Sequence, residues 1–235
     1  KAKSENVKDN KELHDALCTD AIKYLEKSNK IYCSDGRKGS KKQNQNMVYS
    51  DAMLLLGNAY FEMGNVAGAI DSYIKILSVY PQHNLTNQNL RVVLIQTPSM
   101  LMQKKTTSTV NDILEVMSVA VKVMPDCGEI YYVLGVLYGR ELGDMNASIQ
   151  CFDKAETCDF TKTSGYYKDL GVAYGISGQY DKALYALEMA LKLDPNDHVT
   201  YTNLGYTYKN LGQDEKGQSY LNQAEQLKQE FNDKQ

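Results

Sequence analysis

The chain has 235 residues and a formal net charge of −3, with 26 Lys and Arg against 29 Asp and Glu. A near-neutral chain lacks the basic surface that nucleic-acid binding needs, so no nucleic-acid partner is expected. No apolar run approaches the ~18–20 residues of a membrane-spanning helix, which argues against direct membrane insertion of this segment. The hydrophobic fraction of 43% is sufficient for a folded core, and 18 Tyr against 4 Phe and no Trp is an unusual aromatic usage.

The five cysteines are odd in number, scattered along the chain, and include no Cys-x-x-Cys pair. This pattern favours free thiols in a reducing compartment over a disulfide framework, so we expect a cytoplasmic location. The sequence begins with Lys rather than Met, and an upstream targeting segment or membrane anchor would be invisible in it.

The N-terminal part of the chain predicts a helix followed by a loop. Apolar residues recur at helical spacing over residues 11–32, through Leu13, Leu17 and Leu25. Residues 33–46 are polar and rich in Gly, Ser and Lys, which is typical of a loop or linker.

A repeated pattern comes next, in which Leu-Gly-x-x-Tyr occurs at 56–60, 134–138, 170–174 and 204–208. A second glycine comes seven or eight residues after the first in each copy: Gly64, Gly143, Gly178 and Gly212. Small residues also recur in the second half of a copy, as at Ala69 and Ala183, and Pro81, Pro125 and Pro195 close three of the copies.

These spacings predict a helix–turn–helix unit. The small residues would lie where two helices cross closely, because a larger side chain would force the backbones apart. The second glycine would end the first helix in a left-handed conformation, and the proline would stop the second helix.

The pattern resembles the tetratricopeptide repeat (TPR) family, whose repeats are about 34 residues long. We identify repeats at 50–83, 128–162, 164–197 and 198–231 and a degenerate repeat at 94–127. The resemblance implies an all-α fold, a right-handed helical-repeat solenoid of antiparallel helix pairs over residues 50–235. Residues 1–49 would supply an N-terminal capping helix and a polar loop.

The repeats depart from the pattern at identifiable positions. The degenerate repeat has Leu101 where the crossing glycine belongs, and about ten extra residues precede it, with Pro98 at its start or at a break within it. One residue is inserted before Gly143, and Gly217 replaces the crossing alanine in the last repeat.

The sequence offers no catalytic constellation. It contains no Gly-x-Ser-x-Gly, phosphate-binding loop or paired-carboxylate motif, and His14 with Cys18 makes only half of a metal site. The repeated glycines lie at repeat spacing inside expected helices, so packing explains them better than phosphate binding. We therefore expect no enzymatic activity, no metal and no cofactor.

The resemblance also implies a concave groove lined by the first helix of each repeat. The groove-facing positions give these candidate binding residues: Leu54, Asn58, Tyr132, Val136, Lys168, Asp169, Val172, Asn203, Tyr206 and Lys209. Some of these apolar side chains could instead pack between neighbouring repeats. Lys168 and Asn203 also match the family's clamp for chaperone C-terminal tails, but Val172 stands where that clamp needs a second asparagine.

The sequence supports two functional interpretations. The first is a non-catalytic protein–protein interaction scaffold that binds a peptide or a partner helix in the groove, or stacks into a larger assembly. The second is the accessory TPR region of a larger enzyme or of a membrane-anchored protein.

Overall fold

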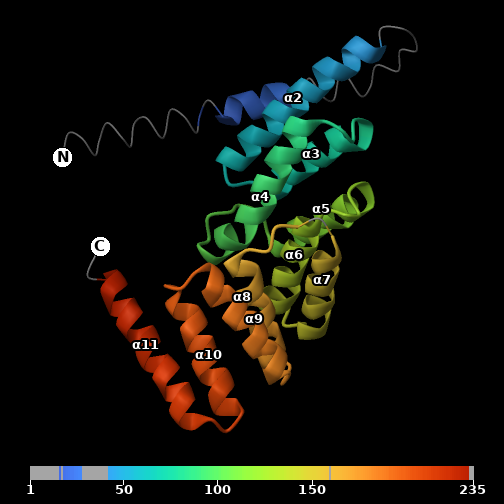
Figure 1. Cartoon of the computed structure of the whole chain (residues 1–235). Coiled ribbons are helices and arrows are strands. Elements are labelled where there is room, and N and C mark those ends of the chain that lie inside the picture. The colour runs from blue at the N-terminus through green and yellow to red at the C-terminus, as the bar shows by residue number, and fades with distance from the viewer. Residues whose placement is uncertain (1–15, 17, 28–41, 159, 233–235) are drawn as a thin grey trace, which may run out of the picture. The chain divides into compact units, whose positions relative to one another are not determined.

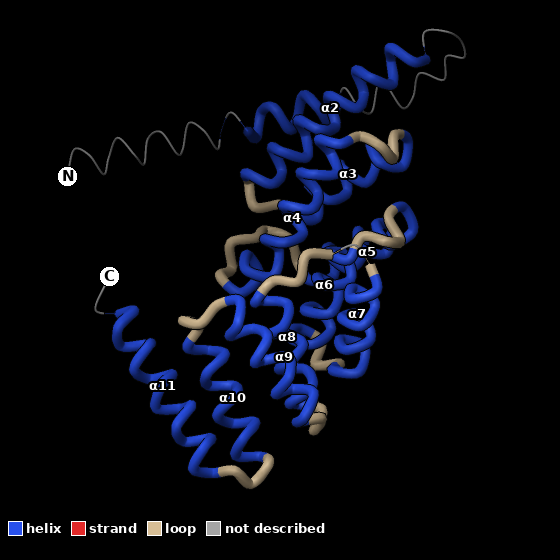
Figure 2. Tube along the Cα trace, viewed as in Figure 1, coloured by secondary structure: helices blue, strands red, loops and turns tan. Residues whose placement is uncertain are grey.

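The chain divides into two units, unit 1 from Lys1 to Pro125 and unit 2 from Asp126 to Gln235. The computed structural model describes residues 16, 18–27, 42–158 and 160–232, and in these ranges the regular elements are all helices (Figure 1). The all-α expectation is therefore confirmed. Short connections join most of the helices (Figure 2). The expected helical residues 11–15 and 28–32, with His14, lie outside the described residues, as do residues 33–41 of the expected loop.

In the part of unit 1 that the structure describes, a helical stretch at 18–27 is followed by four longer helices: α2 (Lys42–Glu62), α3 (Val66–Val79), α4 (Asn84–Met102) and α5 (Val110–Val123). Helix α2 starts at Lys42, so residues 42–46 are helical and not part of the expected loop. The Lys and Gln residues of this stretch have good helix propensity, which allows the helix to extend beyond the repeat pattern. Ile22 and Leu25 pack against the cluster of Met53, Leu56 and Ile76.

Unit 2 contains three successive helix pairs. The first helices are α6 (Gly128–Val136) with a π-helical turn η1 (Leu137–Glu141), α8 (Ser164–Ile176) and α10 (His198–Asn210). The second helices are α7 (Met145–Thr157), α9 (Tyr180–Leu193) and α11 (Asp214–Asn232).

The first glycine of the repeated pattern marks the crossing point of each regular pair. A Cβ atom on Gly171 would lie 2.7 Å from Cγ of Leu187, and one on Gly205 would lie 2.7 Å from Cγ of Leu221. In unit 1 the same atom on Gly57 would lie 2.5 Å from the Tyr73 ring. Gly217 makes the last crossing especially close, because a Cβ there would come within 2.7 Å of the Gly205 carbonyl oxygen.

The second glycines end the first helices as expected. Gly64, Gly143, Gly178 and Gly212 have φ angles of +73°, +71°, +74° and +74°. The residue after each glycine donates its N–H to the carbonyl of the repeat tyrosine, for example Gln179 to Tyr174 at 2.9 Å. This hydrogen bond closes the helix end and fixes the turn into the second helix.

The residue inserted before Gly143 is accommodated by the π-helical turn η1. The N–H of Leu142 donates to the Leu137 carbonyl at 3.1 Å, a bond that spans five residues. The N–H of Asp144 still reaches the carbonyl of the repeat tyrosine, Tyr138, at 2.8 Å. The helix end is therefore preserved, and the extra residue widens the turn before it.

The degenerate repeat differs from the expectation in its first helix. Helix α4 begins at Asn84, so the extra residues lengthen the helix instead of preceding it, and Pro98 lies inside it. The crossing position is occupied by the bulky Leu101, and Ile113 stands at the corresponding small-residue position of α5. Helices α4 and α5 accordingly come closest to α3 and not to each other.

The crossing in repeat 164–197 gives a stability prediction. Replacing Gly171 with Val should destabilise the protein by about 1–3 kcal/mol, because the added carbons overlap Leu187. The melting temperature should fall by roughly 2–10 °C in a thermal unfolding experiment. The matched control is Gly175→Ala in the same helix, where the nearest atoms would be 3.9 Å away. The control should melt at the same temperature as the wild type or higher. Equal melting temperatures for G171V and wild type would contradict a close crossing of α8 and α9 at Gly171.

Candidate functional site

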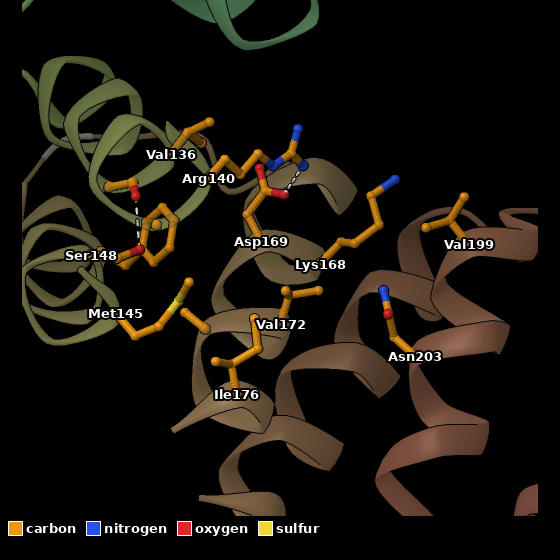
Figure 3. Close-up of a pocket in the computed structure, with 14 residues that line it drawn as sticks. Val136, Arg140, Met145, Ser148, Lys168, Asp169, Val172, Ile176, Val199 and Asn203 are labelled. Atoms are coloured by element: carbon orange, nitrogen blue, oxygen red, sulfur yellow. Dashed lines mark hydrogen bonds and ion pairs between the residues drawn. The ribbon is translucent and has the colours of Figure 1, made fainter. Parts of the chain in front are cut away.

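A pocket of about 330 Å³ opens in unit 2 on the side formed by its first helices (Figure 3). Gly135, Ser148 and Phe152 line it where α6 meets α7. The Ser148 hydroxyl donates to the Gly135 carbonyl at 2.7 Å, which satisfies both groups beneath the pocket. The Ser148 hydroxyl proton is therefore used within the fold.

The walls of the pocket are mainly aliphatic. Val136 and Met145 line one side, Val172 and Ile176 of α8 lie in the middle, and Val199 of α10 lies on the other side (Figure 3). Ile176 is 63% exposed and Val199 is 43% exposed. Apolar groups that remain this accessible beside a pocket can bury area against a ligand side chain.

The pocket brings together five of the ten candidate binding residues. They are Val136, Lys168, Asp169, Val172 and Asn203, from three successive first helices. Tyr132 is buried behind the pocket and contacts Asp169 through its hydroxyl group. The periodic positions thus converge within unit 2, although their role in binding stays a prediction.

The other candidates lie away from this pocket. Tyr206 on α10 is 58% exposed, and Lys209 donates to the Gln218 side chain at 2.9 Å. In unit 1, Leu54 is partly buried against the core cluster of Met53, Leu56 and Ile76, and its expected role in a groove stays a prediction.

Asn58 of unit 1 lines a separate hollow of about 290 Å³. Its side-chain oxygen accepts hydrogen bonds from the Tyr73 hydroxyl at 2.7 Å and from the Asn89 amide at 3.0 Å. This oxygen is therefore engaged within the fold, which makes Asn58 a weaker candidate for ligand binding than the residues of unit 2.

A buried carboxylate lies at one edge of the pocket. Asp169 forms an ion pair with Arg140 and accepts a hydrogen bond from the Tyr132 hydroxyl at 3.1 Å. Burial raises the pKa of the Asp169 carboxyl, while Arg140 and the Tyr132 hydrogen bond act in the opposite direction. Burial, together with the neighbouring Asp169 charge, also raises the pKa of Tyr132.

A second ion pair joins α8 to the start of α10. Nζ of Lys168 lies 2.7 Å from Oδ2 of Asp197, and Oδ2 also accepts from the Thr200 hydroxyl at 2.7 Å. The other Asp197 oxygen accepts the Val199 N–H at 3.1 Å and so caps α10. Burial raises the pKa of Asp197, but these hydrogen bonds and the Lys168 charge outweigh it, and the net pKa is lowered.

Sequence reasoning missed Arg140, Met145 and Ser148 as pocket residues. The position of Arg140 could have been predicted. Arg140 follows Val136 by four residues, which is the same spacing that separates Ile176 from Val172. Met145 and Ser148 lie on α7, a second helix, and no groove-facing pattern includes that helix.

The described residues show no arrangement suited to metal binding. No group of three or more His, Cys, Asp or Glu side chains within them could hold an ion. Of their cysteines, Cys127 is buried, and burial raises the pKa of Cys151 to about 11, which keeps it a thiol. In the same ranges, none of the helices combines the length and apolarity that crossing a membrane requires.

Family profiles match most of the repeats. The profile described as "TPR repeat" matches residues 171–212. Two profiles described as "Tetratricopeptide repeat" match residues 51–83 in one case, and 128–159 and 199–231 in the other.

One curated relative is the "Uncharacterized protein ycf37" of Guillardia theta, which is 36% identical over 87 residues. The match covers 35% of this chain and 48% of that protein, so this chain spans about half of the relative's length.

Solved structures of similar fold include MamA, with 23% identity, a TM-score of 0.56, and coverage of 77% of this chain and 92% of MamA. YrrB, described as a TPR protein with an unusual peptide-binding site, has 16% identity and a TM-score of 0.55, with 80% and 90% coverage. PilW, described as a widely conserved type IV pilus biogenesis factor, has 19% identity and a TM-score of 0.54, with 77% and 78% coverage. At these identities the likeness shows the fold alone.

The Lys168–Asp197 ion pair gives a pH prediction. Asp197→Asn keeps the α10 cap but removes the charge, and should lower the free energy of unfolding at pH 7 by about 1–2 kcal/mol. Because the folded-state pKa of Asp197 is lowered from 3.8, the wild type loses this contribution as the pH falls below that value. The difference in unfolding free energy between wild type and D197N should therefore be smaller at pH 3 than at pH 7.

Urea unfolding at pH 7, 5 and 3 measures this difference. Lys168→Met should produce a similar loss at pH 7, and the double variant should lose less than the two single variants together. Asp181→Asn, at an exposed position on α9, serves as the control. A difference between wild type and D197N that stays constant down to pH 3 would show that the ion pair does not stabilise the fold.

Proposed function

Because this chain belongs to the tetratricopeptide repeat family, we propose that it is a non-catalytic interaction module that binds a peptide segment of a partner protein in the unit 2 pocket. The observation that carries the proposal is the convergence of Val136, Lys168, Asp169, Val172 and Asn203 on one pocket. These residues come from three successive first helices, which is the surface that the family's repeats present to ligands.

The composition of the pocket supports peptide binding without catalysis. Its walls are aliphatic and its polar groups are few, a combination that suits the side chains and main chain of a peptide. The carboxylate of Asp169 is paired and buried, and it offers no open acid or base at the pocket surface. A binding role accounts for this arrangement without any reaction.

The proposed function predicts that the pocket accounts for peptide capture. A library of random 12-residue peptides displayed on phage would be selected on the immobilised full chain, and the enriched peptides would be synthesised. Val172→Asp should weaken their binding at least tenfold, because a carboxylate would be buried against the aliphatic walls. Asn203→Ala should weaken it by a smaller factor, and isothermal titration calorimetry would measure both changes.

The control is Tyr185→Asp on α9, where the tyrosine is 66% exposed and contributes nothing to the pocket. This variant should bind the selected peptides as the wild type does, and circular dichroism would confirm that all variants keep their helicity. Peptides that bind V172D and wild type equally well would place the binding surface elsewhere.

A further inference from the structure

We propose that the unit 2 pocket takes an extended, uncharged peptide segment, with one aliphatic side chain among Val136, Val172 and Ile176 and its main chain at Asn203. The inference rests on the proposed function, since it specifies the kind of segment that the same pocket binds. A preference for an uncharged segment distinguishes this pocket from TPR grooves that hold acidic tails.

The charges around the pocket cancel in pairs. Arg140 is paired with Asp169, and Lys168 is paired with Asp197. In each pair the carboxylate is the less exposed partner: 7% against 32% for the first pair, and 13% against 24% for the second. A ligand carboxylate that approached either cation would meet a charge already neutralised at contact distance, with a second carboxylate beneath it.

An acidic ligand would also meet an apolar surface beside the ion pairs. Val172 lies about one helical turn after Lys168 and Asp169 on α8, and its side chain lines the pocket (Figure 3). Desolvating a ligand carboxylate against the Val172 methyl groups without a hydrogen-bond partner is unfavourable. The peptide residue that fits this surface best has an aliphatic side chain, and the residues beside it carry no formal charge.

The polar groups of the pocket suit a peptide main chain. The Asn203 side chain on α10 faces the pocket, and in the described residues its carboxamide has no hydrogen-bond partner (Figure 3). A carboxamide provides both a donor and an acceptor, which matches the N–H and C=O of an extended segment. A bound helix would already have satisfied its own main-chain groups, so an extended segment is the better match.

The span of the pocket sets the length of the segment. Its lining residues reach from α6 across α8 to α10. Packed helices are about 8–10 Å apart, and because α6, α8 and α10 touch one another only sparsely, two steps at the wide end of this range cover roughly 20 Å. At about 3.3 Å per residue, an extended segment of about six residues crosses this distance.

The experiment uses the same selected peptides and examines their sequences, their salt dependence and their main chain. The enriched 12-residue peptides should share an aliphatic residue or Met within a core of about six residues that lacks Asp and Glu. Their dissociation constants should change less than about twofold between 50 and 500 mM NaCl, because no net charge is neutralised on binding. Replacing the shared aliphatic residue with Ser should weaken binding at least tenfold.

Main-chain recognition is tested with peptides that are N-methylated at one position at a time. One position should weaken binding to the wild type at least fivefold and binding to Asn203→Ala much less. Acidic enriched peptides whose binding falls tenfold in high salt would overturn the proposal, as would peptides that become helical in circular dichroism on binding. In both cases the proposed peptide-binding function would survive. Failure of the wild type to enrich any peptide over V172D would refute that function and this inference together.

Discussion

The close crossing of the two helices in each regular repeat is the constraint on which the rest of the structure depends. Gly57, Gly135, Gly171 and Gly205 let a large side chain of the second helix lie directly against the first helix. The repeat at α4 and α5 lacks this feature, since Leu101 and Ile113 occupy both small-residue positions, and in this repeat α5 associates with α3 and not with α4. A degenerate pair can still be buried, but it no longer supplies a regular first helix beside its neighbours.

The pocket depends on this crossing and on how the fold absorbs an irregularity. Three regular crossings in unit 2 hold α6, α8 and α10 so that residues at equivalent positions face one space. The inserted residue could have disrupted the first of these helices. The bond from Asp144 to the Tyr138 carbonyl preserves the helix end, and the π-helical turn carries Arg140 to its ion pair with Asp169. Such turns are frequent at functional sites.

Residue spacing was sufficient to predict the regular parts of the structure, whereas the pairing of individual side chains was not predictable from it. The glycine positions were sufficient for the helix pairs and the left-handed helix ends. The five candidate residues that line the pocket came from the resemblance to the TPR family, and their role in binding stays a prediction. The longer α2 was not predictable, because its first residues are polar. The longer α4 could have been predicted, because Leu90, Val93 and Leu94 follow helical spacing and are buried. The pairing of Lys168 with Asp197 joins residues of different helices, and periodicity within a helix does not show it. Leu54 shows that a groove-facing position can also be a packing position.

The unusual tyrosine content connects the scaffold to the pocket. Several tyrosine rings pack where helices meet, and their hydroxyl groups are used: Tyr73 donates to Asn58, Tyr166 to the Phe152 carbonyl and Tyr208 to Glu188. Tyr132 belongs to this set, since its ring packs near Phe152 and Tyr166 while its hydroxyl holds Asp169. A phenylalanine would fill the same space but would leave the buried carboxylate with one hydrogen bond fewer. Tyrosine at this position therefore lets one side chain pack the core and donate a hydrogen bond to the buried carboxylate at the pocket edge.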